Sequence, residues 1–172
     1  MIPSLTDTLC TRCGLCCDGS LFGDVELAGR TEATRLEIMG LDIEDDDAAG
    51  GLLLQPCAAL RGTRCSVYAH RPKCCRTFEC RLLQDVRRGA TTVERARKLI
   101  AEALRRTRRV KALLARLGRR AVPLPLGERV AEALAVAASP DPWVNRHCTE
   151  LEAEMSAVEV LIRKTFLAGR KT

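Results

Sequence analysis

A stripe of mostly apolar residues recurs at helical spacing along the second half of the chain. It steps by three and four residues without a break through Val93, Ala96, Ile100, Ala103, Thr107, Val110, Leu114 and Leu117. This spacing predicts one long amphipathic helix. Gly118 follows directly and is suited to the C-terminal end of that helix, so we expect the helix to stop there.

Two more helices are predicted after a linker at 121–127 that contains two prolines. An alanine-rich segment predicts a helix at about 128–138. The segment Thr149-Glu150-Leu151-Glu152 has the form of a capping box and predicts the start of a last helix. Its apolar stripe runs through Leu151, Met155, Val158, Ile162 and Phe166, and it ends near Gly169.

The first half of the chain shows weaker patterns. Thr31–Met39 predicts a helix, and Leu52–Gln55 and Cys65–Tyr68 predict short strands that flank a turn at 61–64. The rest of the first half is expected to be irregular. The predicted fold class is therefore mainly α with a short β-hairpin, in which a metal-stabilised cysteine-rich module is followed by C-terminal helices.

Basic and acidic residues are also distributed differently in the two halves of the chain. Residues 1–90 hold 11 Lys and Arg against 13 Asp and Glu, whereas residues 91–172 hold 17 against 9. We expect a cysteine-cluster metal-binding module at 1–90 and a basic helical region at 91–172 that packs on it. The acidic run at 44–47 is expected to be a solvated loop.

The basic helix raises the question of a polyanionic partner. Thirteen Lys and Arg but only two acidic residues lie between Arg87 and Arg120, and such a face could contact phosphates. No aromatic side chain interleaves the arginines for base stacking, and no nucleic-acid-binding motif is present, which argues against nucleic acid. The alternatives are a solvated helix face or a protein partner that carries acidic groups.

The length of the apolar runs indicates where in the cell the protein is located. No apolar run approaches the length that spans a bilayer, and the first residues show no basic-then-apolar export signal. The sequence therefore predicts a cytoplasmic protein without a membrane partner. The cytoplasm keeps thiols reduced, so the cysteines are expected to bind metal rather than to form disulfides.

Ten cysteines and only five aromatic residues suggest that bound metal replaces part of a hydrophobic core. Cys10, Cys13, Cys16 and Cys17 form a nested C-x-x-C pattern, whose spacing lets thiolates converge on one ion, and Gly14 permits the positive φ that such a turn often needs. Three thiolates at this spacing also match ferredoxin-type iron–sulfur motifs, although the following Cys-Pro is absent. The cofactor is expected to be an iron–sulfur cluster or Zn²⁺.

A second group of cysteines supplies the remaining ligands. Eight thiolates would serve two four-thiolate sites, and neighbouring arginines would favour the thiolate form. That arrangement leaves one cysteine of the second doublet and Cys148 unused. The distal group consists of Cys57, Cys65, Cys74, Cys75 and Cys80.

These residues together resemble the YkgJ-type cysteine-cluster family, zinc- or iron-chelating domains of the CxxCxxCC type. The resemblance is carried by the first cluster, by Cys57-x-x-Leu60 and Cys65-x-Val67-Tyr68, and by Arg71-Pro72-x-x-Cys75-Arg76-x-Phe78-x-Cys80. It implies that Cys74 and Cys148 are additional. It implies metal-ligand roles for Cys10, Cys13, Cys16, Cys17, Cys57, Cys65, Cys75 and Cys80.

Three classes of function follow. The first is a metal-binding protein whose centre is structural, redox-active or used in metal handling. The second is an iron–sulfur enzyme or accessory subunit, because some members of the family resemble parts of protein lysine methylases. The third is a basic adaptor for nucleic acid or an acidic protein. No nucleophilic triad, phosphate-binding loop or dinucleotide motif is present, so any catalysis would belong to the metal centre.

Overall fold

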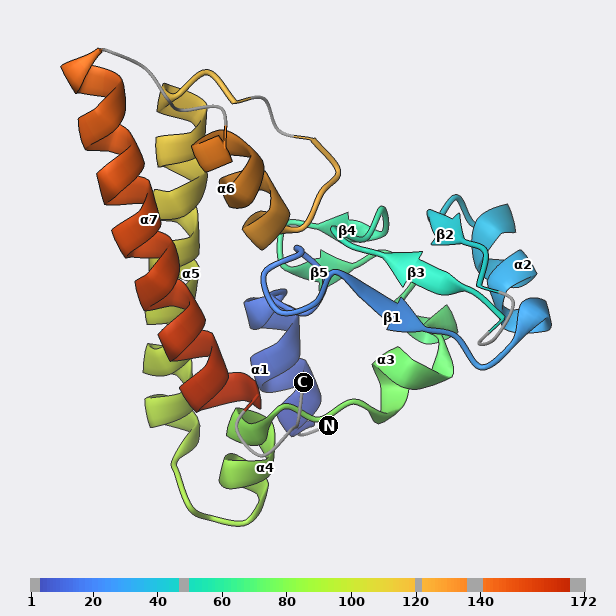
Figure 1. The fold of residues 1–172 in the computed structure, drawn as a ribbon. Coiled ribbons are helices and arrows are strands. Elements are labelled where there is room, and N and C mark those ends of the chain that lie inside the picture. The colour runs from blue at the N-terminus through green and yellow to red at the C-terminus, as the bar shows by residue number, and fades with distance from the viewer. Residues whose placement is uncertain (1–3, 47–49, 120–121, 136–140, 168–172) are drawn as a thin grey trace. The chain divides into compact units, whose positions relative to one another are not determined.

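The computed structural model describes residues 4–46, 50–119, 122–135 and 141–167 of the chain. They divide into two compact units, Met1–Glu79 and Cys80–Thr172, which run from blue to green and from green to red in Figure 1. The fold is mainly α-helical with a small β part, which confirms the predicted fold class. Within the described residues, no helix has both the length and the apolar character required to cross a membrane.

The first unit contains short helices where the sequence indicated mostly irregular chain. Helix α1 (Leu5–Cys13) begins with a capping box, in which the Ser4 and Asp7 side chains each accept a hydrogen bond from the backbone N–H of the other residue. Helix α2 (Arg30–Ile38) lies within one residue of its predicted bounds. A 3₁₀ turn, η1 (Tyr68–His70), precedes the short helix α3 (Lys73–Thr77).

The strands of the first unit form two small antiparallel sheets. Strand β3 (Leu52–Leu54) lies between β1 (Asp24–Glu26) and β2 (Ile43–Glu44). A separate hairpin pairs β4 (Leu60–Arg61) with β5 (Arg64–Cys65). The prediction that Leu52–Gln55 flanks the turn as a hairpin strand is therefore wrong, because residues 52–54 pair elsewhere.

One apolar cluster of the first unit consists of the buried side chains Leu27, Ala33, Leu36, Leu41, Leu53 and Ala59. Leu9 and Leu15 are also buried in this unit, outside that cluster. Four cysteines are among the partly buried residues packed against it, namely Cys57, Cys65, Cys74 and Cys75. Because six buried residues, two of them alanines, bury little apolar surface, this cluster is a weak basis for an independent fold. These four thiols lie at the edge of this apolar cluster.

The second unit is built from α4 (Arg81–Arg87), α5 (Val93–Arg116), α6 (Leu126–Ala135) and α7 (Pro142–Ile162), followed by a π-helical turn at Arg163–Leu167. Helix α5 confirms the long predicted helix. Its first turn is capped by the Thr92 side chain, which accepts a hydrogen bond from Arg95 N. Residues 136–138 of the predicted second helix, and the predicted stop at Gly169, lie outside the described residues.

Helix α7 begins eight residues earlier than the capping box with Thr149 as its N-cap predicts. Asp141 is the N-cap and accepts a hydrogen bond from Trp143 N, and Pro142 occupies the first helical position. A proline is well suited there, because the first N–H groups of a helix have no partner within it. The Thr149 hydroxyl instead donates to the Asn145 carbonyl at 3.1 Å, inside the helix.

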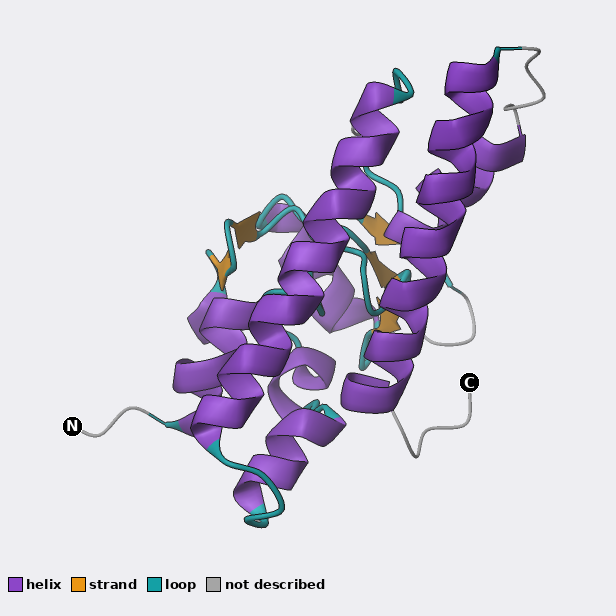
Figure 2. Ribbon diagram, turned by 90° about the vertical axis from the view of Figure 1, so that its left-hand side faces the viewer, coloured by secondary structure: helices purple, strands orange, loops and turns teal. Residues whose placement is uncertain are grey.

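Helix α7 packs along α5, and α6 contacts both (Figure 2). The apolar stripe that the sequence indicates is buried on α5, and Leu151, Met155, Val158 and Ile162 are buried on α7. Leu126, Val130 and Ala133 of α6 complete the core. The second unit therefore has a continuous hydrophobic core of its own.

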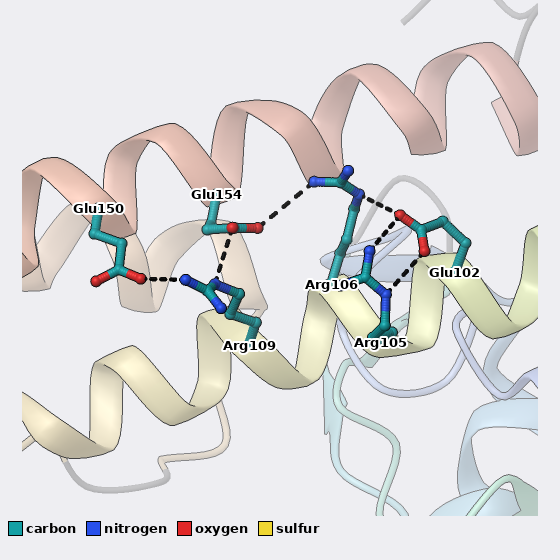
Figure 3. Close-up of polar contacts among 6 residues, drawn as sticks. All are labelled: Glu102, Arg105, Arg106, Arg109, Glu150 and Glu154. Carbon is teal, nitrogen blue, oxygen red and sulfur yellow. Dashed lines mark hydrogen bonds and ion pairs between the residues drawn. The ribbon is translucent and has the colours of Figure 1, made fainter.

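Arginines of α5 are neutralised by glutamates of α5 and α7 (Figure 3). Arg106 lies 2.7 Å from Glu102 and 3.6 Å from Glu154. Arg109 pairs with Glu150 and lies 2.9 Å from Glu154. Hydrogen bonds from Arg105, and then from Arg106, lower the pKa of the Glu102 carboxyl. Three arginines of the basic helix are thus engaged within the unit, which weakens the case for a polyanion-binding face.

Thr107 is the one buried side chain of the α5 stripe that carries a hydroxyl. It is 2% exposed, and its Oγ1 has no hydrogen-bond partner among the described residues. A buried hydroxyl without a partner costs on the order of 1–3 kcal/mol. We expect Thr107→Val, which replaces the hydroxyl by a methyl of similar size, to raise the free energy of unfolding of the second unit by about 1 kcal/mol.

Urea denaturation followed by the fluorescence of Trp143 measures this effect, because the chain's single tryptophan lies in α7. Thr107→Ser is the matched control, since it keeps the hydroxyl and removes only a methyl group. A loss of stability in Thr107→Val would contradict the prediction and indicate that the hydroxyl has a bound water as partner.

Candidate metal centre

The cysteines of the first cluster follow one another around the end of a helix. Cys10 and Cys13 lie in the last turn of α1, three residues apart, so they share one face of that helix. Gly14 ends the helix with φ of 71°. Cys16 and Cys17 lie in the turn that follows, where Cys17 N donates to the Gly14 carbonyl at 2.9 Å. The first two cysteines are therefore held by a helix, which the C-x-x-C spacing alone does not indicate.

Gly14 meets two requirements at once. Its positive φ favours a residue without a side chain, and a Cβ atom there would lie 3.1 Å from Thr63 Cα. The Thr63 hydroxyl donates to the Thr11 carbonyl at 2.8 Å. The turn between β4 and β5 is thereby fixed against the end of α1.

The next two cysteines are placed by backbone hydrogen bonds. Cys57 N donates to the Cys17 carbonyl at 2.8 Å, and Leu60 N donates to the Cys57 carbonyl at 2.9 Å. Leu60 then lies opposite Cys65 in the antiparallel hairpin. The backbones of Cys17 and Cys57, which are 40 positions apart in the chain, are therefore directly hydrogen-bonded. The hairpin that follows contains Cys65.

The second doublet lies on α3. Pro72 is buried and is the N-cap residue of this helix, which fixes the entry of the chain into Cys74 and Cys75. A hydrogen bond between the two thiols lowers the pKa of Cys74. The same bond, followed by burial and by the nearby Cys17 and Cys57, raises the pKa of Cys75.

Neighbouring cysteines influence one another's ionisation in the first unit. Burial, followed by the nearby Cys57 and Cys65, raises the pKa of the Cys17 thiol to about 12. Burial also raises the pKa of Cys57, and the neighbouring Cys65 adds to it. Each of these thiols is thus near enough for its charge to affect another, and Cys75 belongs to the same group.

Cysteine thiols of this kind have the chemistry of metal ligands. All ten cysteines are among the described residues, and all are reduced and half-buried. Cys17, Cys57 and Cys75, whose thiols resist ionisation in the absence of a cation, would be stabilised as thiolates by a divalent one. As the side chains stand, however, no three His, Cys, Asp or Glu residues in the described part of the chain are arranged to hold a metal ion. Metal binding would therefore require thiols to reorient.

A polar network that the sequence did not predict lies beside these cysteines. The Tyr68 hydroxyl donates to Asp7 Oδ1 at 3.2 Å, which ties α1 to η1. The Arg71 guanidinium lies 3.6 Å from the centre of the Tyr68 ring, and its Nε donates to the Tyr68 carbonyl at 3.0 Å. Arg71 also lowers the pKa of Cys17, opposing the larger effect of burial. The Ser4-x-x-Asp7 capping pattern was the sequence signal for this end of α1.

The other candidate residues are dispersed. Cys80 belongs to the second unit, as the N-cap residue of α4. Cys148 is half-buried on α7, next to His147, whose ring stacks on Trp143 with centroids 4.0 Å apart. His70 is exposed. Phe78 packs edge-on against Phe22, with centroids 5.2 Å apart.

Arg71 offers a test of the network. Replacing it by methionine keeps an apolar side chain of similar length but removes the cation over the ring and the hydrogen bond from Nε. We expect Arg71→Met to lower the local opening free energy of residues 68–75 by about 1–2 kcal/mol, measured by hydrogen exchange. The control is Arg76→Met in the neighbouring exposed position, expected to change it by less than about 0.5 kcal/mol. Equal effects of the two substitutions would show that the contacts of Arg71 with Tyr68 do not stabilise residues 68–75.

Comparison with known proteins gives one match. The family model CxxCxxCC, described as a "Putative zinc- or iron-chelating domain", matches residues 9–107. The matched segment covers more than half of the 172 residues and contains every cysteine except Cys148. No curated protein and no solved structure matches the chain significantly.

Proposed function

Because the chain belongs to the CxxCxxCC family, we propose that it binds zinc or iron through cysteine thiolates. The observation that carries this proposal is the hydrogen bond from Cys57 N to the Cys17 carbonyl, which joins two cysteine segments that lie far apart in the sequence, with Cys65 following in the β4–β5 hairpin. Thiolates in these segments would need a cation beside them, since Cys57 and Cys65 both raise the pKa of Cys17.

The ligands we propose are the eight cysteines of the family pattern. Cys74 and Cys148 are left out, so they serve as controls. The residues that follow 90 are proposed as a basic helical region without ligands, and a reducing, cytoplasmic location suits such a centre. The proposed ligands are Cys10, Cys13, Cys16, Cys17, Cys57, Cys65, Cys75 and Cys80.

The chain's own residues prepare the thiols for this role. When bound, the metal supplies the positive charge that keeps the thiolates ionised, and an iron–sulfur centre would in addition exchange electrons. The hairpin β4–β5 and helix α3 hold the thiols at the edge of the apolar cluster, which limits contact with water. Arg71 contributes a fixed positive charge near Cys17. Each thiol gives up its proton to solvent on binding.

Anaerobic purification of the full chain, followed by metal analysis and a visible spectrum, tests the proposal. We expect stoichiometric zinc or iron. A brown protein with inorganic sulfide would identify an iron–sulfur cluster, which the C-x-x-C-x-x-C spacing favours, and a colourless protein with zinc would identify a zinc site. Cys148→Ser is expected to retain the metal, and Cys57→Ser to lose some of it. A folded wild-type chain that takes up neither metal would refute the function.

A further inference from the structure

We infer that Glu32 of α2 is a positioning residue for the cysteine doublet at 74–75. Its carboxylate holds the first residue of α3, the helix that carries Cys74 and Cys75, at a fixed place against α2. The inference rests on the proposed function, because it concerns how Cys75 is presented to a metal. Glu32 acts through the backbone of α3 and is not itself proposed as a ligand.

The two carboxylate oxygens of Glu32 bind two backbone segments that are distant in the chain. Oε1 accepts a hydrogen bond from Lys73 N at 2.9 Å, and Oε2 accepts one from Ala28 N at 3.0 Å. Hydrogen bonds to an ionised carboxylate are roughly twice as strong as those between neutral groups. The Glu32 side chain is only 13% exposed, so water competes little for these bonds. One side chain thus joins the start of α2 to the start of α3.

Helix α3 cannot supply this bond from its own residues. Its N-cap, Pro72, has no side-chain acceptor and makes no capping hydrogen bond. The helix is five residues long, which is too short to be stable through its own hydrogen bonds. Glu32 therefore provides, from α2, an acceptor that the sequence of α3 lacks. The place of the doublet's backbone is accordingly set by α2.

Arg35, one turn further along α2, adds a second and weaker contact to the same segment. Its Nη2 lies 3.5 Å from the His70 carbonyl and 3.8 Å from Glu32 Oε1. Ala33 and Leu36, the neighbours of these two side chains in α2, belong to the apolar cluster against which both cysteines of the doublet pack. Helix α2 therefore holds the doublet's segment through polar contacts and apolar packing together.

A fixed α3 lowers the cost of ligation by Cys75. A thiol whose backbone is already held has only its side chain to order on binding, whereas an unanchored α3 would also lose backbone freedom. The Cys75 thiol gives its proton to solvent, and its sulfur binds the metal. Groups that orient a ligand from behind typically contribute 10–100-fold to metal affinity, and we expect the effect of Glu32 to be of this size.

Cobalt titration of the full chain under anaerobic conditions, in competition with a chelator, tests this role. We expect Glu32→Ala to weaken the affinity about 10–100-fold and, at saturating cobalt, to reduce the thiolate-to-cobalt absorption as Cys75→Ser does. Glu32→Gln keeps an oxygen for Lys73 N and should recover most of both losses. Glu37→Ala is the matched control, since it removes the same charge from an exposed position of α2 and should change neither quantity.

The saturated spectrum separates positioning from stability, because a residue that only stabilised the fold would lower the affinity without changing that spectrum. An unchanged saturated spectrum in Glu32→Ala, or equal losses in Glu37→Ala, would overturn the inference. If Glu32→Ala does not fold, Glu32→Asp takes its place with the same expectations, because its shorter side chain cannot reach both N–H groups.

Hydrogen exchange of the chain as purified gives a readout that does not depend on cobalt. Replacing Glu32 by alanine should lower the protection of residues 73–78 and leave that of β3 unchanged. Unchanged protection at 73–78 would contradict the role of Glu32. Failure of the proposed function looks different: the wild-type chain would then bind no cobalt, while the exchange comparison would still decide whether Glu32 holds α3.

Discussion

Removing the bound metal from the full chain with a chelator is expected to unfold the first unit and leave the second folded. The six-residue apolar cluster of the first unit is small, and the described strands of this unit are two or three residues long. A structural metal in a small domain supplies apparent folding energy on the order of 10 kcal/mol. The second unit contributes one proposed ligand, Cys80, but should stay folded because its core is formed by the side chains of α5, α6 and α7.

Hydrogen exchange read by mass spectrometry separates the two responses. Amides of residues 15–65 should lose protection after chelation, whereas those of α5 and α7 should keep it. Trp143 fluorescence, which reports on α7, should not change. Retained protection in residues 15–65 would mean that packing alone holds the first unit and would contradict the structural role of the metal. Returning the metal should restore protection, which distinguishes unfolding from damage by the chelator.

Truncating a fully buried leucine of the second unit should have the next largest effect. Leu114 of α5 and Leu151 of α7 are both 0% exposed. Replacing either by alanine removes buried methyl groups and leaves a cavity, so the free energy of unfolding of this unit should fall by about 2–5 kcal/mol. Urea denaturation monitored by Trp143 measures the fall, since the signal belongs to this unit alone.

Val160→Ala is the matched control for these truncations. Val160 also lies on α7 but is 60% exposed, so its replacement is expected to change the stability by less than about 0.5 kcal/mol. Metal content should stay at the wild-type value in all three variants. A loss below about 1 kcal/mol in both leucine variants would show that α5 and α7 are not held by this core.

The sequence predicts the second unit better than the first because its elements are long. Twenty-four residues of α5 give the stripe from Val93 to Leu117 enough repeats to stand out, and Gly118 marks the end. Helix α7 shows where prediction from an apolar stripe fails. Its first two turns bury little, since Trp143 is 49% exposed, so the apolar stripe begins only at Leu151. The capping pattern at Thr149 therefore suggests that the helix starts there, whereas Asp141 and Pro142 form its actual start.

In the first unit, local patterns are too short to specify pairing. Leu52–Leu54 is recognisable as a strand, but its partners are two- and three-residue strands without alternation, and nothing local selects them. Helix α1 is not predicted from its cysteine spacing, although Ser4 and Asp7 carry a capping pattern. The approach of Cys57 to Cys17 is a long-range contact, made in part by a backbone hydrogen bond, and no spacing rule predicts it.

The adjacency of Cys16 and Cys17 has a consequence for how the chain loads. If their side chains serve different centres, one peptide unit is anchored from both ends. Filling one centre then restricts the backbone dihedrals of the adjacent cysteine, which is a ligand of the other centre. The second metal therefore binds to a backbone that is already ordered, at a smaller entropic cost. Loading should accordingly be cooperative, with half-filled chains scarce at substoichiometric metal. Native mass spectrometry would then show mainly empty and fully loaded molecules.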